Sequence, residues 1–393
     1  MRILLAFDKF KGSLKASEAC SIAAEAIATI APQATVIQRP LTDGGEGFCE
    51  IVTEALGGIT REYKVTYPDL SEGKGRVGYV FLDKVADSIR EMLDLPEQGM
   101  LAIIEMAQAG GHQLVSDQDR NPWKYSSHGV GELIRYAQAD GATRCLVGVG
   151  GSATNDMGIG LLEAFGLKAY DKAGHKLTPI TPAKWESVEH FEKPVRIPSL
   201  SIRIACDVRN PLHGYNGAAA IFGPQKGLTV SDLPRMQEEM LRMDQLLRPL
   251  FPAGAMGSDT PGMGAAGGLP FGLSLAFETI LVPGFELICE ILQLSKEIDE
   301  ADIVITGEGA FDKSSLSGKG PFEIVSQAVT KQKQVCLFAG KVVEEAREAL
   351  LEMDSTIHIR QLGISGASVQ ENIRHEKRNL RIRIQETLPL LLR

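Results

Sequence analysis

Acidic residues follow short apolar runs at several places in this chain, each time close to glycine. Asp8 directly follows RILLAF, and Asp207 directly follows SIRIAC. Asp43 stands in LTDGGEG, while Glu308 and Asp312 stand in TGEGAFD after the run ADIVI. Glycine lets a backbone come close to a ligand, and a carboxylate placed there can bind a metal ion or accept a proton. The last segment is expected to be a turn that its glycines build around the two acids.

These acids are expected to lie near one another. In open α/β sheets ligands bind outside the carboxyl ends of the strands, so the acids, with Asp156 among them, should share one rim or two facing rims. Carboxylates gathered in this way repel one another, so a cation must enter with the ligand. Mg²⁺ carrying nucleotide phosphates meets this need, because proteins hold Mg²⁺ through one or two carboxylates, waters and phosphate oxygens. We expect Glu308 and Asp312 to hold it, directly or through water.

Two glycine-rich segments are suited to hold phosphates. GVGGSATNDMGIG occupies 148–160 and PGMGAAGGL occupies 261–269, and each precedes a helical pattern. Glycine loops that open helices offer backbone N–H groups to phosphate oxygens. The expected nucleotide-binding residues are Gly150, Gly151, Ser152, Asn155, Gly264 and Gly267. The later segment SGKG is not a P-loop, because Lys313 stands where the Walker pattern requires its first glycine.

A dinucleotide site is the alternative interpretation of the first glycine segment. Gly148, Gly150 and Ala153 fit GxGxxA after an apolar run, and Asp171 stands where the ribose-binding acid of a Rossmann unit would be. This alternative predicts an NAD(P)-dependent dehydrogenase of a small hydroxy acid. The polar SATND insertion and the other acidic loops argue against it, because hydride transfer has no use for them.

Positive charge is concentrated in AFDKFKGSLK, which contains Lys9, Lys11 and Lys15 with Ser13 among them. This segment is either a basic surface turn or a pocket for a carboxylate or for the charge on a transferred phosphoryl group. Further candidates for anion contacts are Lys226, Lys319, Arg209 and Asn210. For the last two, capping and turn roles are equally open.

The composition is that of an ordinary globular protein. The chain has 393 residues, a net charge of −9 and 44% hydrophobic residues, which predicts two or three globular units and argues against a wide basic surface for nucleic acid. The six cysteines lack metal-ligand spacing, so we expect free thiols of a reducing cytoplasm. No signal-peptide or membrane-helix pattern occurs, which favours a cytoplasmic protein. Apolar runs alternate with Ala-rich stretches at both chain ends, which indicates a parallel sheet covered by helices.

Seven motifs, taken in order, resemble the bacterial type I glycerate kinase family. They are DKFKGSL, LTDGGEG, NPWKYSSHGVGELI, GVGGSATNDMGIG, CDVRNPLHGYNGAAAIFGPQKG, PGMGAAGGL and TGEGAFDKSSLSGKGP. The resemblance implies a glycerate kinase that phosphorylates D-glycerate with ATP and Mg²⁺ in glyoxylate, glucarate and galactarate breakdown. The expected product is 2-phosphoglycerate, with 3-phosphoglycerate as the alternative. The expected partners are glycerate and the nucleotide, without nucleic acid or membrane, and a homodimer is an open possibility.

The resemblance also implies an architecture and roles for residues. Residues 1–58 and 285–393 would form a Rossmann-like parallel-sheet domain, a second α/β domain would be inserted at 59–284, and the active site would lie in the interdomain cleft. We expect Lys11 and Ser13 to bind the glycerate carboxylate or the transferring phosphoryl group. We expect Asp43 or Asp207 to take the proton of the attacking hydroxyl. The remaining expected substrate-binding residues are Asp8, Arg209 and Asn210.

The chain departs from the family pattern at a few positions. Serine is usual where Lys9 stands, tyrosine where His128 stands, and arginine where Ala310 stands. If that arginine contacts phosphate in the family, Lys313 or Arg209 would take its place here. The insert at 84–93 is expected to be a surface elaboration.

Overall fold

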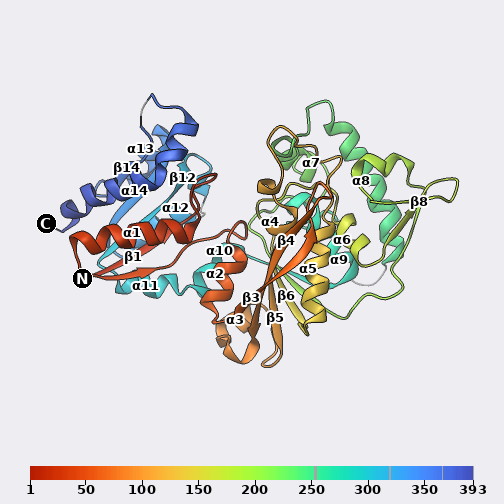
Figure 1. Cartoon of the computed structure of the whole chain (residues 1–393), viewed down its shortest axis with the longest axis horizontal. Helices are drawn as coiled ribbons and strands as arrows, with labels where there is room; N and C mark the ends of the chain where they lie inside the picture. The colour runs from red at the N-terminus through yellow and green to blue at the C-terminus, as the bar shows by residue number, and fades with distance from the viewer. Residues whose placement is uncertain (252–254, 318–319, 365, 393) are drawn as a thin grey trace. The chain divides into compact units, whose positions relative to one another are not determined.

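The computed structural model describes residues 1–251, 255–317, 320–364 and 366–392. The chain divides into two compact units (Figure 1). Unit 1 comprises Met1–Asp43 and Ile288–Arg393, and unit 2 comprises Gly44–Leu287. Both units combine helices with a sheet that contains parallel strands, so the predicted α/β class is confirmed. The domain limits at 58 and 284 stay a prediction.

The sheet of unit 1 has five strands, all parallel, in the order β14-β13-β12-β1-β2. The strands are β1 (Arg2–Phe7), β2 (Thr35–Gln38), β12 (Ile303–Phe311), β13 (Gln334–Val342) and β14 (His358–Gln361). The helices are α1 (Ala16–Ile30), α11 (Leu294–Glu300), α12 (Gly320–Thr330), α13 (Glu344–Met353) and α14 (Val369–Leu391). The chain leaves the centre of this sheet toward β2 through α1 and toward β13 through α12. Because parallel crossovers are right-handed, these two helices cover opposite faces.

Helices α1 and α14 lie side by side on one face of this sheet (Figure 1). Alternate residues of β1, namely Ile3, Leu5 and Phe7, belong to the buried cluster on this side. Helix α14 adds Leu380 and Ile384, which are four residues apart and therefore share a helix face. The mixed charge of the C-terminal segment thus belongs to the opposite, solvated face of a packed helix.

The main sheet of unit 2 has six strands in the order β11-β10-β6-β5-β4-β3. These are β3 (Ile59–Thr66), β4 (Glu72–Phe81), β5 (Met100–Glu105), β6 (Arg144–Gly148), β10 (Ser201–Ala205) and β11 (Glu278–Val282). The strands from β5 to β11 run parallel, while β4 is antiparallel to both of its neighbours. A small sheet joins β7 (Lys168–Tyr170), β8 (Lys176–Leu177) and β9 (His190–Glu192). The parallel part therefore brings the carboxyl ends of β5, β6 and β10 to one edge.

The helices of unit 2 are short, apart from α5 and α8. They are α2 (Phe48–Ala55), α3 (Asp87–Met92), α4 (Ala107–Gly110), α5 (His128–Ala139), α6 (Ile159–Ala164), α7 (Ala218–Phe222), α8 (Leu233–Leu247) and α9 (Leu269–Ala276), with α10 (Gly284–Ile291) reaching into unit 1. Among the described residues, no helix has the length and apolar character that a membrane crossing requires.

The expected turn at Gly307 and Gly309 is wrong, because strand β12 continues through Phe311. Its parallel ladder with β13 is still paired at Glu308 and Ala310. A Cβ on Gly307 would lie 1.9 Å from the carbonyl oxygen of Phe338 in β13. The glycines are therefore needed for close approach between neighbouring segments of backbone.

A core substitution in β12 tests how far this strand supports unit 1. Ile305 is 1% exposed, and Ile305→Ala should lower the free energy of unfolding by about 3 kcal/mol, because burial is lost and a cavity remains. Urea denaturation measures the change. The control is Leu351→Ala on α13, where the side chain is 40% exposed and the change should stay within about 0.5 kcal/mol. Equal losses in the two variants would contradict this account of the core.

Candidate active site

Three charged side chains meet where β1 ends in unit 1. The backbone N–H of Asp8 donates to the carbonyl of Gly307 at 2.9 Å, which places Asp8 beside β12. The Nζ atom of Lys9 lies 3.2 Å from Oδ1 of Asp43 and 3.7 Å from Oδ1 of Asp8. Burial raises the pKa of Asp8 to about 6; the ammonium of Lys9 opposes this rise, and the charge of Asp43 adds to it. The cluster thus carries more negative charge than Lys9 alone offsets.

Glu308 adds a further acid to this cluster. Burial raises the pKa of Glu308 to about 7, a hydrogen bond from Ser315 opposes the rise, and the charges on Asp8 and Asp312 add to it. Its Oε1 atom is buried and has no hydrogen-bond partner among the residues that the structure describes. Asp312 is more exposed, and hydrogen bonds from the side chain and the backbone of Ser314 lower its pKa. A buried, unpartnered carboxylate oxygen is costly, and a cation would relieve that cost.

The donors of this cluster suit a hard divalent ion. Carboxylate oxygens are the protein ligands that Mg²⁺ prefers, and the unpartnered Oε1 atom of Glu308 is one such donor. Within the part of the chain that the structure describes, no group of three or more acidic, His or Cys residues is arranged as a complete metal site.

The turn between β1 and α1 packs over β12. A Cβ on Gly309 would lie 2.9 Å from the backbone nitrogen of Lys11, so only glycine allows this approach. The side chain of Lys11 is exposed. The hydroxyl of Ser13 donates to the carbonyl of Ile373 in α14 at 3.3 Å. Ser13 therefore helps to hold α14 here, and its expected contact with substrate stays a prediction.

The glycine loop after β6 in unit 2 packs against the DGGEG turn. The N–H of Gly150 donates to the carbonyl of Gly44 at 2.9 Å. A Cβ on Gly150 would lie 2.6 Å from the Cα atom of Gly45. Gly151 has a φ of +72°, which favours glycine, and it is exposed. Within this loop, the exposed surface that a phosphate could reach belongs mainly to Gly150 and Gly151.

The polar side chains of the same loop point inward. Ser152 is 6% exposed, and its hydroxyl accepts a hydrogen bond from Nζ of Lys226 at 2.8 Å. Lys226 also donates to the carbonyl of Thr154 at 2.7 Å, and burial lowers its pKa to about 7. Asn155 is fully buried, with Nδ2 donating to Sδ of Met240. The expected contacts of Ser152 and Asn155 with phosphate stay predictions.

Asp156 does not line a rim, and that expectation is wrong. Its side chain is 0% exposed. Its carboxylate accepts hydrogen bonds from the N–H and hydroxyl of Ser127 and from the N–H groups of Gly158 and Gly160. Asp156 therefore joins the starts of α5 and α6. The sequence does not reveal this, because the polar side chains of a loop after a strand can face either solvent or the interior.

The second glycine segment is shaped by packing on other backbone. A Cβ on Gly264 would lie 2.2 Å from the carbonyl oxygen of Pro211, and one on Gly267 would lie 2.2 Å from that of Thr154. The carbonyl of Asn210 accepts from the N–H of Gly264 at 2.9 Å, and Nδ2 of Asn210 donates to the carbonyl of Asn216 at 2.8 Å. These contacts give Gly264, Gly267 and Asn210 a structural role, while their expected ligand contacts stay predictions.

Asp207 and Arg209 follow the end of β10. Oδ1 of Asp207 accepts from the N–H of Phe285 at 3.1 Å and so caps α10. Its Oδ2 atom is buried and has no partner within the described part of the chain. The side chain of Arg209 is exposed. Asp207 therefore keeps one oxygen for other chemistry. Lys319 lies outside the described residues.

Asp171 has a local role that argues against a ribose site. Its carboxylate accepts hydrogen bonds from the N–H groups of Ala173 and His175 at 2.9 and 2.8 Å. These bonds close the turn between β7 and β8 in the small sheet. The acid that the dehydrogenase alternative requires is therefore used to form a turn.

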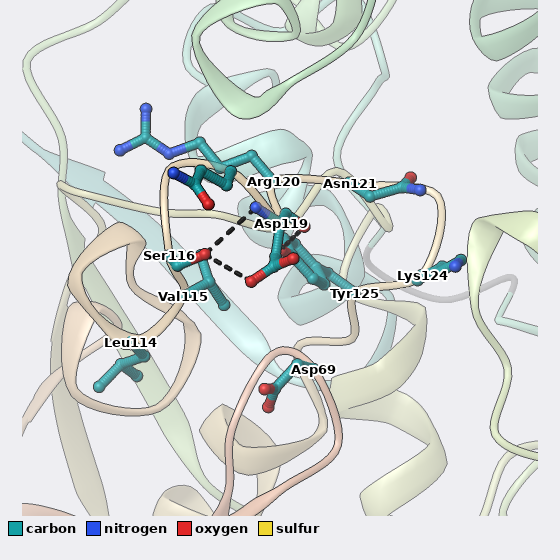
Figure 2. Close-up of a pocket in the computed structure, with 10 residues that line it drawn as sticks. Asp69, Leu114, Val115, Ser116, Asp119, Arg120, Asn121, Lys124 and Tyr125 are labelled. Carbon is teal, nitrogen blue, oxygen red and sulfur yellow. Dashed lines mark hydrogen bonds between the residues drawn. The ribbon is translucent and has the colours of Figure 1, made fainter.

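A cavity of about 500 Å³ opens on unit 2 beside the segment 114–125 (Figure 2). Ser116 and Asp119 bond to each other within this segment, and Tyr125 donates to the carbonyl of Asp119. The charged ends of Arg120 and Lys124 point in different directions in Figure 2. The lining contains none of the predicted site residues, and its polar groups do not converge on one point.

Comparison with known proteins supplies the family. Residues 3–391 match the model of the Glycerate kinase family. The chain belongs to this family. The Bacillus subtilis glycerate kinase is 33% identical to it over 348 residues, which cover 88% of this chain and 86% of that protein. The glycerate 2-kinase of Escherichia coli K12 is 33% identical over 349 residues, with the same coverage of 88% and 86%.

A solved structure agrees with this assignment. A crystal structure assigned to glycerate kinase 2 from Salmonella typhimurium LT2 superposes with a TM-score of 0.70 at 30% identity, and the match covers 100% of this chain and 98% of that one. The resemblance inferred from the seven motifs is therefore confirmed. As a member of the glycerate kinase family, the protein is a kinase that transfers a phosphoryl group to an alcohol. The dehydrogenase alternative is set aside on this ground.

Two lysines of this family member have contacts that sequence reasoning did not foresee. The sequence leaves Lys9 either in a basic surface turn or in an anion pocket, and in the structure its ammonium lies against Asp8 and Asp43. Lys226 is a candidate for an anion contact in the sequence, and in the structure it is 2% exposed beneath the glycine loop. The signal for Lys9 was available, because it directly follows an acid at a strand end. The sequence offers no comparable signal for Lys226, whose partners are more than seventy residues away.

The raised pKa of Glu308 predicts a pH-dependent stability. A carboxyl whose pKa rises from its ordinary value to about 7 on folding stabilises the fold while protonated and loses that contribution as the pH increases through about 7. In metal-free protein, Glu308→Gln should therefore exceed the wild type in unfolding free energy near pH 8, by at most about 3 kcal/mol. Near pH 5 the two proteins should be similar. Urea denaturation at both pH values measures this, and a Gln variant that is weaker near pH 8 would contradict the assignment.

Proposed function

We propose that this protein uses ATP and Mg²⁺ to phosphorylate D-glycerate and that 2-phosphoglycerate is the product, with 3-phosphoglycerate as the alternative. The observation that carries the proposal is the group of acids at the ends of neighbouring strands in unit 1, of which Asp8 and Glu308 have raised pKa values. Such a group favours the arrival of a cation. The name of the Escherichia coli relative, glycerate 2-kinase, supports the choice of product.

The metal would be held by carboxylates of the unit 1 cluster. Glu308 supplies a buried oxygen that has no partner in the described ranges. Asp312 supplies Oδ2, because its bonds with Ser314 use Oδ1. When bound, Mg²⁺ would neutralise charge that develops on the phosphoryl oxygens. Glu308 and Asp312 would determine the position of the metal and therefore the place where this charge is neutralised.

Asp43 is the better candidate for the base that accepts the proton of the attacking hydroxyl. Its side chain is 42% exposed and is therefore open to a substrate. Asp207, the alternative, already uses Oδ1 to cap α10. The Nζ atom of Lys9 lies 3.2 Å from Oδ1 of Asp43, so Lys9 can hold that carboxylate in one orientation. A base must reach the proton that it removes, so exposure favours Asp43.

Exposed backbone and an exposed lysine would bind the anionic groups. In unit 2, Gly151 is exposed and Gly150 is partly exposed, and the backbone of such a glycine loop suits phosphate oxygens. Lys11 is exposed on the turn after β1, and its ammonium would bind the glycerate carboxylate or the transferring phosphoryl group. Phosphoryl transfer requires mainly alignment and charge neutralisation, and these groups supply both. A cytoplasmic location and a homodimer stay predictions.

Substitution of the acids tests their assignment. Asp43→Asn should lower kcat by about 100-fold or more, because a positioned base is lost. Asp312→Asn should raise the Mg²⁺ concentration that half-maximal activity requires, by about 10-fold, because a ligand charge is lost. ADP release with D-glycerate at varied Mg²⁺ measures both. The matched control is Asp171→Asn, whose carboxylate bonds to Ala173 and His175 within a surface turn. Wild-type kinetics in all three variants would contradict the proposal.

The position of the new phosphate tests the product. The reaction mixture can be coupled to enolase, which accepts 2-phosphoglycerate, with or without phosphoglycerate mutase. We expect signal without the mutase. A signal that requires the mutase would assign 3-phosphoglycerate.

Addition of NAD⁺ or NADP⁺ in place of Mg-ATP should produce no thermal stabilisation.

A further inference from the structure

Glu105, the last residue of β5, is a buried carboxylate that the proposed chemistry does not use. It is 2% exposed. It accepts hydrogen bonds from the backbone N–H of Cys49 at 3.2 Å and from Nε2 of Gln108 at 3.4 Å, and the N–H of Gly47 is a further donor. Gly47 is the N-cap of α2 and has no side chain that could cap the helix. The carboxylate of Glu105 therefore satisfies first-turn N–H groups that the local sequence leaves open.

The turn that leads into α2 needs such an anchor. Gly44 and Gly47 have φ angles of +85° and +91°, and glycine loses more conformational freedom on ordering than any other residue. At one end of the turn, the carbonyl of Gly44 is held by the N–H of Gly150 at 2.9 Å. At the other end, Glu105 holds Gly47 and the start of α2.

The same carboxylate also lies beside the start of the glycine loop. Strands β5 and β6 are neighbours (Figure 1), and Glu105 pairs in register with Gly148, the last residue of β6. The N–H of the following residue, Met106, donates to the carbonyl of Gly148 at 2.9 Å. Glu105 is thus placed where the DGGEG turn and the glycine loop are both anchored.

We propose that Glu105 is a positioning residue for phosphoryl transfer, which holds the DGGEG turn against the glycine loop and thereby fixes the position of Asp43. Asp43 directly precedes Gly44 in the chain, so a displaced turn displaces its carboxylate. Rates of aligned reactions fall steeply with small displacements. The inference rests on the proposed role of Asp43 as the base.

A carboxylate is better suited to this task than an amide. Its two oxygens only accept hydrogen bonds, and the groups around it donate them. Glu105→Gln would point an NH₂ group, or a single remaining acceptor, at those donors. The variant keeps the volume and burial of the side chain, so it changes the anchoring of the turn more than the packing of the core.

A double-mutant cycle separates positioning from simple capping. The proteins are the wild type, Glu105→Gln, Asp43→Asn and the double variant, each assayed for ADP release with D-glycerate and Mg-ATP. Glu105→Gln should lower kcat by about 10-fold or more with both KM values within about 3-fold, because alignment is lost and binding is kept. The double variant should be within about 3-fold of Asp43→Asn alone, because residues that act as a unit are non-additive.

Glu297→Gln is the matched control for loss of a buried carboxylate. Glu297 is 5% exposed and accepts from Arg2 and Arg39, both at 2.6 Å, in unit 1. The Glu297→Gln variant should lower the melting temperature at least as much as Glu105→Gln does, but it should leave kcat unchanged. If Glu105→Gln does not fold, Glu105→Asp enters the same cycle, since it keeps the charge and withdraws it from the N–H groups.

Each outcome decides the question. If Glu105→Gln keeps the wild-type kcat while Asp43→Asn is slow, Glu105 only caps the helix and the inference is wrong. Losses that multiply in the double variant would show that Glu105 acts independently of Asp43 and would overturn the inference. Wild-type kcat in Asp43→Asn would instead remove the proposed base, and with it the route through which Glu105 acts.

Discussion

Direct packing of backbone on backbone, which only glycine allows, is the constraint on which both units depend. A Cβ on Gly307 would lie 1.9 Å from the carbonyl oxygen of Phe338, and one on Gly150 would lie 2.6 Å from Cα of Gly45. Any larger residue would push these segments apart, and with them the side chains that they carry. The glycines therefore bring polar backbone and charged side chains close together at the ends of strands. They are needed for packing first, and their use in ligand binding depends on that packing.

The acids of unit 1 show what this close approach costs. Burial raises the pKa of Asp8 to about 6 and that of Glu308 to about 7, so the cluster resists full ionisation at neutral pH. Lys9 offsets part of the charge through Asp43 and Asp8. A kinase that binds a metal with its nucleotide can use such a cluster, because the metal supplies the missing positive charge when the substrate is present. The repulsion among these acids, which makes the cluster costly to ionise, is thus the same property that would favour a cation.

In unit 2, buried side chains hold the glycine loops in a single conformation. These side chains are polar and hydrogen-bonded. Lys226 donates to Ser152 and to the carbonyl of Thr154, and Asp156 joins the starts of two helices. Such networks define one arrangement because an unpaired buried polar group is costly. Glu105 belongs to the same class of residue, with backbone N–H groups as its partners. Phosphoryl transfer asks mainly for alignment, and buried anchors of this kind provide it.

The sequence by itself determined the α/β class, the parallel sheet built from both chain ends, the glycerate kinase family and the position of acids such as Asp8 at strand ends. The α/β class and the acids at strand ends depend on local signals, namely apolar runs and helical periodicity. The family, and the sheet built from both chain ends that the resemblance implies, depend on the motifs in order. Only the tertiary structure decided that Asp156 is buried, that Ser13 bonds to α14, that Glu308 lies within a strand and that Lys226 lies beneath a loop. The reason is that burial and hydrogen-bond partners come from segments far apart in the chain, so the same polar residue after a strand can face solvent or the interior.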